Sequence, residues 1–164
     1  MTLLPFIAAI FDRDLLALRR EVEAYSDERE LWIRVAGITN VAGNLVLHLA
    51  GNLQYYIGSV LGRTGYVRDR PAEFARRDVP RAELLREIEA ARSVVKAALE
   101  GPIDVEAEFP ESILGMRVRT GDYLIHLATH FAYHLGQLDY HRRIVTKHDK
   151  GIDAMRPSEL SSAQ

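Results

Sequence analysis

The segment from residue 39 to residue 62 limits the fold most strongly, because none of its 24 residues is Asp, Glu, Lys or Arg. As a helix, a segment of this length could cross a lipid bilayer. However, Asn44, His48 and Asn52 lie inside it, and their polar groups would be costly to leave unpaired in hydrocarbon. We therefore expect a helix that is buried by neighbouring helices rather than by lipid.

Three other stretches repeat apolar side chains every three or four residues, which is typical of amphipathic helices. They cover residues 3–24, 80–100 and 120–147. Thr39 or Asn40 could cap the uncharged helix, which would run to about Gly62. Because long connections join the four helices, the sequence predicts an all-α protein, a four-helix bundle with long crossover connections.

The connections carry further expectations. Residues 105–109 and 116–119 alternate apolar and polar side chains, so one short β-hairpin could precede the fourth helix. Substrate selectivity would come from loops at 25–38, 63–79 and 101–119. Residues 1–147 are expected to form a single domain, followed by a polar C-terminal tail at 148–164.

Glycines at 43, 51 and 58 lie inside the uncharged helix. Each interior glycine costs a helix about 1 kcal/mol relative to alanine. The helix is therefore plausible only if neighbouring backbones pack closely at these glycines.

The overall charge and the absence of cysteine exclude several functions. Lys and Arg number 21 against 23 Asp and Glu, which gives a net charge of −2. No whole-molecule positive field exists to attract nucleic acid or an anionic membrane, so neither is an expected partner. Without cysteine the chain has no disulfide and no thiolate metal site, so a metal must use nitrogen or oxygen ligands. The N-terminus lacks the basic leader and cleavage site of a secretory signal, and we expect a cytoplasmic protein.

The histidines are the main candidates for chemistry, because GxxxxGKS or GKT, GxGxxG, GxSxG and HExxH motifs are all absent. His126, His130 and His134 recur every four residues, which places them on one helical face. Two imidazoles at this spacing can bind one cation, and His48, on another helix, could be the third ligand. The spacing leaves open whether the pair is 126/130 or 130/134. The alternative is a solvated histidine face and a His48 that is merely hydrogen-bonded.

Two segments resemble the signature segments of the DinB/YfiT-like superfamily of metal-dependent enzymes. They are His-Leu-Ala-Gly-Asn at 48–52 and His-Phe-Ala-Tyr-His-Leu-Gly-Gln at 130–137. Tyr-Val-Arg-Asp-Arg-Pro-Ala-Glu-Phe at 66–74 is similar to one subgroup of the same superfamily. The similarity extends from about residue 5 to about residue 147.

This resemblance implies a divalent metal ion, often nickel or zinc, held by His48, His130 and His134. Some relatives have glutamate in place of the first histidine of the helix-4 pair, whereas this chain has three histidines. The best-understood relatives transfer or isomerise small-molecule substrates with a low-molecular-weight thiol, such as bacillithiol or mycothiol, and are commonly homodimers. A metal-dependent hydrolase and a non-enzymatic metal-binding or stress-related module are the alternatives. Three neutral histidines leave a coordination position open, as catalytic sites do, but no protein residue is identified as the general base.

Several residues could surround such a centre. Asn44, Asn52 and Gln137 could orient the imidazoles through hydrogen bonds. Alternatively, Asn44 and Asn52 could satisfy buried backbone groups or bridge helices. Four tyrosines could line a cleft near the metal or form the rim of the core; they are Tyr55, Tyr56, Tyr123 and Tyr133. His126 and His141 are left as non-ligands. Arg142 and Arg143 could attract an anion or complement the helix dipole.

Overall fold

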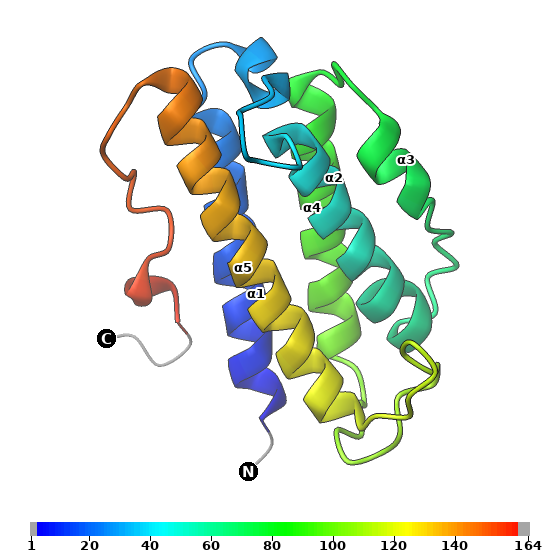
Figure 1. Ribbon diagram of the computed structural model, residues 1–164. Helices are drawn as coiled ribbons and strands as arrows, with labels where there is room; N and C mark the ends of the chain where they lie inside the picture. Colours follow the sequence, from blue (N-terminus) through cyan, green and yellow to red (C-terminus); the bar gives the residue numbers. More distant parts are fainter. Residues whose placement is uncertain (1–2, 161–164) are drawn as a thin grey trace.

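The computed structural model describes residues 3–160, and within this range it is all-helical. Four long helices form the bundle: α1 (Leu4–Glu23), α2 (Ala42–Leu53), α4 (Arg81–Leu99) and α5 (Thr120–Thr146). They run side by side in Figure 1, whereas the short helix α3 (Arg70–Ala75) lies on the outer side of α2. The predicted all-α bundle with long connections is therefore confirmed.

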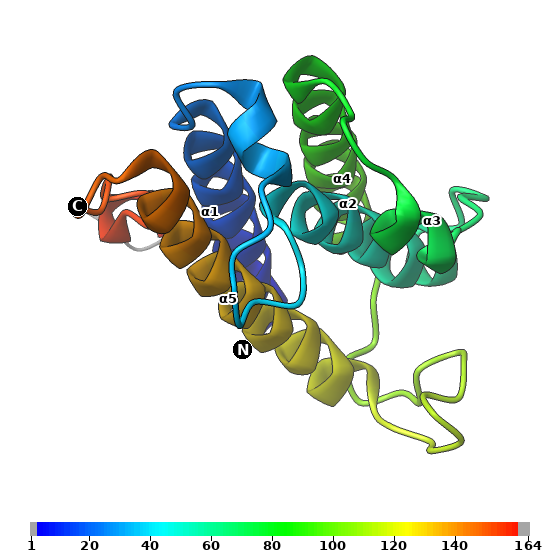
Figure 2. The same cartoon turned by 45° about the horizontal axis from the view of Figure 1, so that its top comes forward.

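The contacts between helices define the bundle. Helix α1 packs against α4 and α5, and α2 packs against the same two helices. Figure 2, in which the top of the bundle is turned forward, shows the resulting four-helix arrangement. Large side chains from several helices fill the interior, including Phe11, Leu18, Leu53, Leu84 and Phe131. Each helix thus buries its apolar face against two neighbours.

The second helix is uncharged and buried, as the sequence predicts, but it changes form halfway. Every residue of α2 is buried, and the chain continues as a π-helix, η2 (Gln54–Leu61). A Cβ at Gly43 would collide with the Trp32 ring, and one at Gly58 would collide with Val94. The groups packed closely at these glycines are side chains rather than the neighbouring backbones that we expected. In the described part of the chain, no helix is long and apolar enough to span a membrane.

Two local predictions differ from the structure. The cap of α2 is Val41, without a side-chain hydrogen bond, so neither Thr39 nor Asn40 caps this helix. The preceding connection instead contains a 3-10 helix, η1 (Glu28–Trp32), with a capping box made by Asp27 and Glu30. Residues 105–119 form only isolated antiparallel bridges, Glu108 with Arg119 and Ile113 with Met116, and no strand is formed among the described residues.

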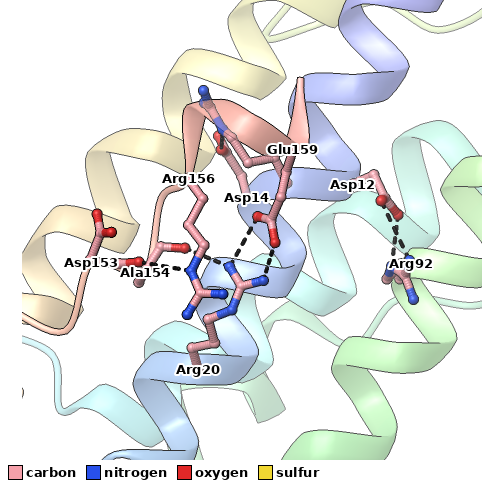
Figure 3. Close-up of polar contacts among 9 residues, drawn as sticks. Asp12, Asp14, Arg20, Arg92, Asp153, Ala154, Arg156 and Glu159 are labelled. Atoms are coloured by element: carbon pink, nitrogen blue, oxygen red, sulfur yellow. Dashed lines mark hydrogen bonds and ion pairs between the residues drawn. The ribbon is translucent and has the colours of Figure 1, made fainter. Parts of the chain in front are cut away.

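Part of the predicted C-terminal tail lies against α1. Arg20 Nη1 donates to the carbonyl oxygen of Ala154 at 2.7 Å, and its guanidinium pairs with the Glu159 carboxylate. Figure 3 shows this cluster, together with the Arg92–Asp12 pair at 2.7 Å that joins α4 to α1. Glu159 belongs to the short 3-10 helix η3 (Pro157–Glu159), and Ala154 is buried. These contacts tie the described end of the chain to the bundle, and residues 161–164 lie outside the described range.

Candidate metal centre

Three histidine side chains converge between α2 and α5. His48 lies in the middle of α2, and His130 and His134 lie one turn apart on α5. One ring nitrogen from each lies within 4.8 Å of the other two. The Nε2 atoms of His48 and His130 are 3.4 Å apart. Two ligands of a tetrahedral zinc ion lie about 3.3 Å apart when each bond is near 2.05 Å, so the His48–His130 pair has the separation that a divalent ion requires.

His126 lies outside this trio. Its ring stacks between those of Tyr123 and His130, with centroids 5.7 and 6.1 Å away, and it is exposed. Of the two pairs that the spacing left open, the 130/134 pair lies with His48 in the structure. The two α5 rings meet the His48 ring nearly edge-on, at 78° and 87°.

The outer nitrogens of two histidines are hydrogen-bonded to side chains. His48 Nδ1 lies 2.9 Å from Glu73 Oε2, and His134 Nδ1 lies 2.8 Å from Gln137 Oε1. An ionised carboxylate and an amide oxygen only accept hydrogen bonds, so both Nδ1 atoms carry the proton. Arg68 Nη2 also lies 3.2 Å from His48 Nδ1, but it donates to Glu73 Oε2 at the shorter distance of 2.8 Å. In the neutral imidazole with this tautomer, Nε2 keeps its lone pair, which is the state required of a ligand. Gln137 therefore makes the contact that we expected of it, a hydrogen bond that orients an imidazole.

The surroundings of the two α5 histidines keep their imidazoles neutral. Burial, followed by the neighbouring histidines, lowers the pKa of His130 to about 4. Burial also lowers the pKa of His134, although its bond to Gln137 opposes the shift. Because a metal binds only the unprotonated imidazole, both side chains have the required form at neutral pH.

Glu73 is the functional residue that our sequence reasoning missed. It is buried on α3, where its carboxylate accepts bonds from Arg68 Nε at 2.6 Å and Arg68 Nη2 at 2.8 Å, besides the bond from His48. Burial by itself would raise the pKa of Glu73, but the hydrogen bonds from His48 and Arg68 outweigh it and leave the pKa lowered. The sequence did contain a signal for Glu73, because the 66–74 segment that resembles the superfamily includes both Arg68 and Glu73.

The position of Glu73 depends on two residues of α2. Asn44 Nδ2 donates to the carbonyl oxygens of Glu73 and Arg76 at 2.7 and 3.0 Å, which fastens α3 to α2. Gly51 lies beside the carboxylate: a Cβ there would lie 3.2 Å from Glu73 Cδ and would collide with Oε1. Asn44 therefore acts on α3 rather than on a histidine, and Gly51 leaves room for the carboxylate.

Aromatic rings extend from the trio toward the start of α5. Tyr56 and Tyr123 meet at 5.2 Å, and the Arg68 guanidinium lies 5.7 Å from the Tyr56 centroid. Burial and a hydrogen bond with Tyr56 raise the pKa of Tyr123, so this phenol stays protonated. Tyr55 instead donates to the Glu111 carboxylate at 2.9 Å.

A cleft of about 710 Å³ opens on the other side of His134. We call it the α5 cleft; its walls are residues 37–40, Leu45 and five positions of α5, namely Tyr133, His134, Gly136, Gln137 and Tyr140. The connection between η1 and α2 runs past α5 here (Figure 2). The trio thus has an aromatic neighbourhood on one side and an open cleft on the other.

Two polar residues near the end of α5 are structural. Arg142 is buried and pairs with Glu21 at 2.5 Å and Asp139 at 2.7 Å. Its guanidinium is therefore paired within the protein, which corrects the expectation that Arg142 could attract an anionic ligand. His141 is also buried, between the Tyr25 hydroxyl at 2.9 Å and the carbonyl oxygen of Ile33 at 2.8 Å.

Fold and site together define an all-helical bundle with a three-histidine group that suits a divalent metal. The chain belongs to the mycothiol S-transferase family, which is DinB/YfiT-like, because the model of that family matches residues 7–147. The resemblance found in the sequence is thereby confirmed. No curated protein and no solved structure matches the chain.

Proposed function

We propose that this protein is a metal-dependent enzyme that transfers mycothiol sulfur to a small electrophilic substrate. The observation that carries the proposal is the convergence of His48, His130 and His134, each with a nitrogen within 4.8 Å of the others. Membership of the mycothiol S-transferase family supplies the thiol and the reaction class. The proposal includes nickel or zinc as the ion.

The side chains of the protein would hold the metal ion and keep its histidine ligands in place during this reaction. A divalent ion at the trio would supply positive charge that makes a nearby thiol more acidic. Glu73 and Gln137 hold two imidazoles in the ligand tautomer through their Nδ1 hydrogens. In the transfer, the sulfur forms a bond to the electrophilic carbon, the leaving group departs with its electron pair, and the thiol proton is released.

Elemental analysis of the purified, tag-free protein tests the ligands. We expect about one divalent ion per chain in the wild type, and its loss in His48→Ala, His130→Ala and His134→Ala. His126→Ala is the matched control, because it removes a histidine from the same helix outside the trio. Little metal in the wild type, even after reconstitution, would reject the metal site.

Turnover assays then separate the function classes. Thiol-dependent conversion of a chromogenic electrophile such as 1-chloro-2,4-dinitrobenzene, abolished by a chelator and restored by the metal, would support an S-transferase. Hydrolysis of an ester or amide without thiol would indicate the hydrolase instead. A bound metal with neither activity would indicate a metal-binding module.

The proposal also includes a cytoplasmic location and a homodimer. Light scattering would measure the mass of the particle in solution and so test the dimer.

A further inference from the structure

The connection between η1 and α2 forms one wall of the α5 cleft and is loosely packed. In Figure 2 it runs past α5, and residues 37–40 line the cleft together with His134. None of residues 33–40 is buried, whereas every residue from 41 to 53 is buried. Segments with few buried contacts open more easily than the elements that they join. We call residues 33–40 the flap.

A buried histidine of α5 holds the first residue of the flap. His141 Nε2 lies 2.8 Å from the carbonyl oxygen of Ile33, and its Nδ1 lies 2.9 Å from the Tyr25 hydroxyl. Burial lowers the pKa of His141 and keeps the ring neutral. Because a carbonyl oxygen only accepts, Nε2 carries the proton, and Nδ1 accepts from Tyr25, whose contact with the Leu138 carbonyl oxygen is longer, at 3.4 Å. Among the described residues, no other hydrogen bond or ion pair joins residues 34–40 to another element.

The tip of the flap is a turn that stands away from the core. Ile38 N donates to the carbonyl oxygen of Val35 at 3.1 Å, and Gly37 has a φ of +81°, which residues with a Cβ rarely adopt. A Cβ at Gly37 would meet no atom within 4 Å. Val35 and Ile38 are half-buried, but neither belongs to the described residues that pack against the hydrophobic core. The flap therefore has a defined shape but few contacts that hold it in place.

We propose that the flap controls access to the histidine trio through the α5 cleft, and that His141 is the positioning residue that holds it. A flap that moves between a closed and an open position changes how fast a metal ion or a substrate reaches a site. Entry and exit change by the same factor, because the barrier between the bound and free states changes and the two states themselves do not. This inference rests on the proposed metal-dependent function, since it concerns access to the metal site.

Rates of zinc exchange on the full-length protein test the flap without any turnover. Stopped-flow mixing with zinc gives the rate of entry, and mixing of the zinc-loaded protein with excess chromophoric chelator gives the rate of exit. His141→Phe removes the bond to Ile33 and keeps a ring of similar size, so we expect both rates to rise about two- to tenfold, as the loss of one hydrogen bond predicts. Gly37→Ala should act in the same direction, because alanine disfavours the positive φ of the turn. Hydrogen exchange of the amides of residues 34–40 should quicken in both variants.

Two control variants and the zinc affinity distinguish the outcomes. His141→Gln keeps an amide that can donate to Ile33, and His148→Phe makes the same ring exchange at an exposed position beyond α5, so both should keep the wild-type rates. Faster entry and exit in the two flap variants, at unchanged zinc affinity, supports the proposal. Unchanged rates, or a weaker affinity with an unchanged rate of entry, overturn it, because either result shows that access to the trio does not depend on the flap. A wild type that binds no zinc would reject the proposed function as well, whereas flap-dependent exchange without thiol-dependent turnover would reject the function alone.

Discussion

Changing Gly51 to alanine should weaken metal binding although Gly51 ligates nothing. The new Cβ would lie 3.2 Å from Glu73 Cδ and would collide with Oε1. To restore an ordinary contact, the carboxylate must shift by about 1 Å. It has little freedom to do so, because Arg68 holds Oε1 at 2.6 Å and His48 holds Oε2 at 2.9 Å. The shift therefore breaks the bond that orients His48.

The size of the effect follows from the role of such bonds. Loss of the partner of a metal-binding histidine typically weakens metal affinity about 10- to 100-fold. We expect a change of that order in Gly51→Ala, measured by competition for zinc with a chromophoric chelator. Glu73→Gln should show the same direction of change, because it keeps the shape of the side chain and removes the charge.

Gly151→Ala is the matched control, since a Cβ at Gly151 would meet nothing within 4 Å. It should keep the wild-type affinity. Circular dichroism and chemical denaturation of the metal-free proteins report whether each variant folds. A folded Gly51→Ala protein with unchanged zinc affinity would refute the argument that Glu73 must stay in place.

Three further predictions concern individual contacts. Gln137→Ala should weaken zinc affinity by about tenfold, because His134 loses its Nδ1 partner; the same chelator competition measures it. Glu21→Ala should lower the free energy of unfolding by about 1.5–3 kcal/mol in urea denaturation, because the buried Arg142 loses its nearest partner and keeps only Asp139. For His141, burial lowers the pKa below 6.5, so below pH 6.5 the unfolded chain binds a proton that the folded chain does not, and stability falls as the pH drops. The metal-free His141→Gln protein should lose part of this pH dependence, and an unchanged slope would contradict it.

Apolar spacing was enough to predict three of the long helices, since it determines which face a segment buries, and the lack of charge over residues 39–62 predicted the other. The predicted stretches 3–24, 80–100 and 120–147 agree with α1, α4 and α5 within one or two residues. Local signals were less reliable at the ends of helices. Thr39 and Asn40 have side chains that commonly cap helices, yet α2 begins after Val41. Packing of α2 against η1 is a tertiary contact that such a local signal does not include.

Helical spacing alone placed His126, His130 and His134 on one face, and it could not decide which of them meet His48. That depends on the height at which α2 crosses α5, which only packing determines. The same holds for Glu73, which reaches His48 because Asn44 fastens α3 to α2 and Gly51 leaves space for the carboxylate. A pattern within one segment describes that segment's own faces, whereas the contacts between segments depend on how the packed helices are placed in three dimensions.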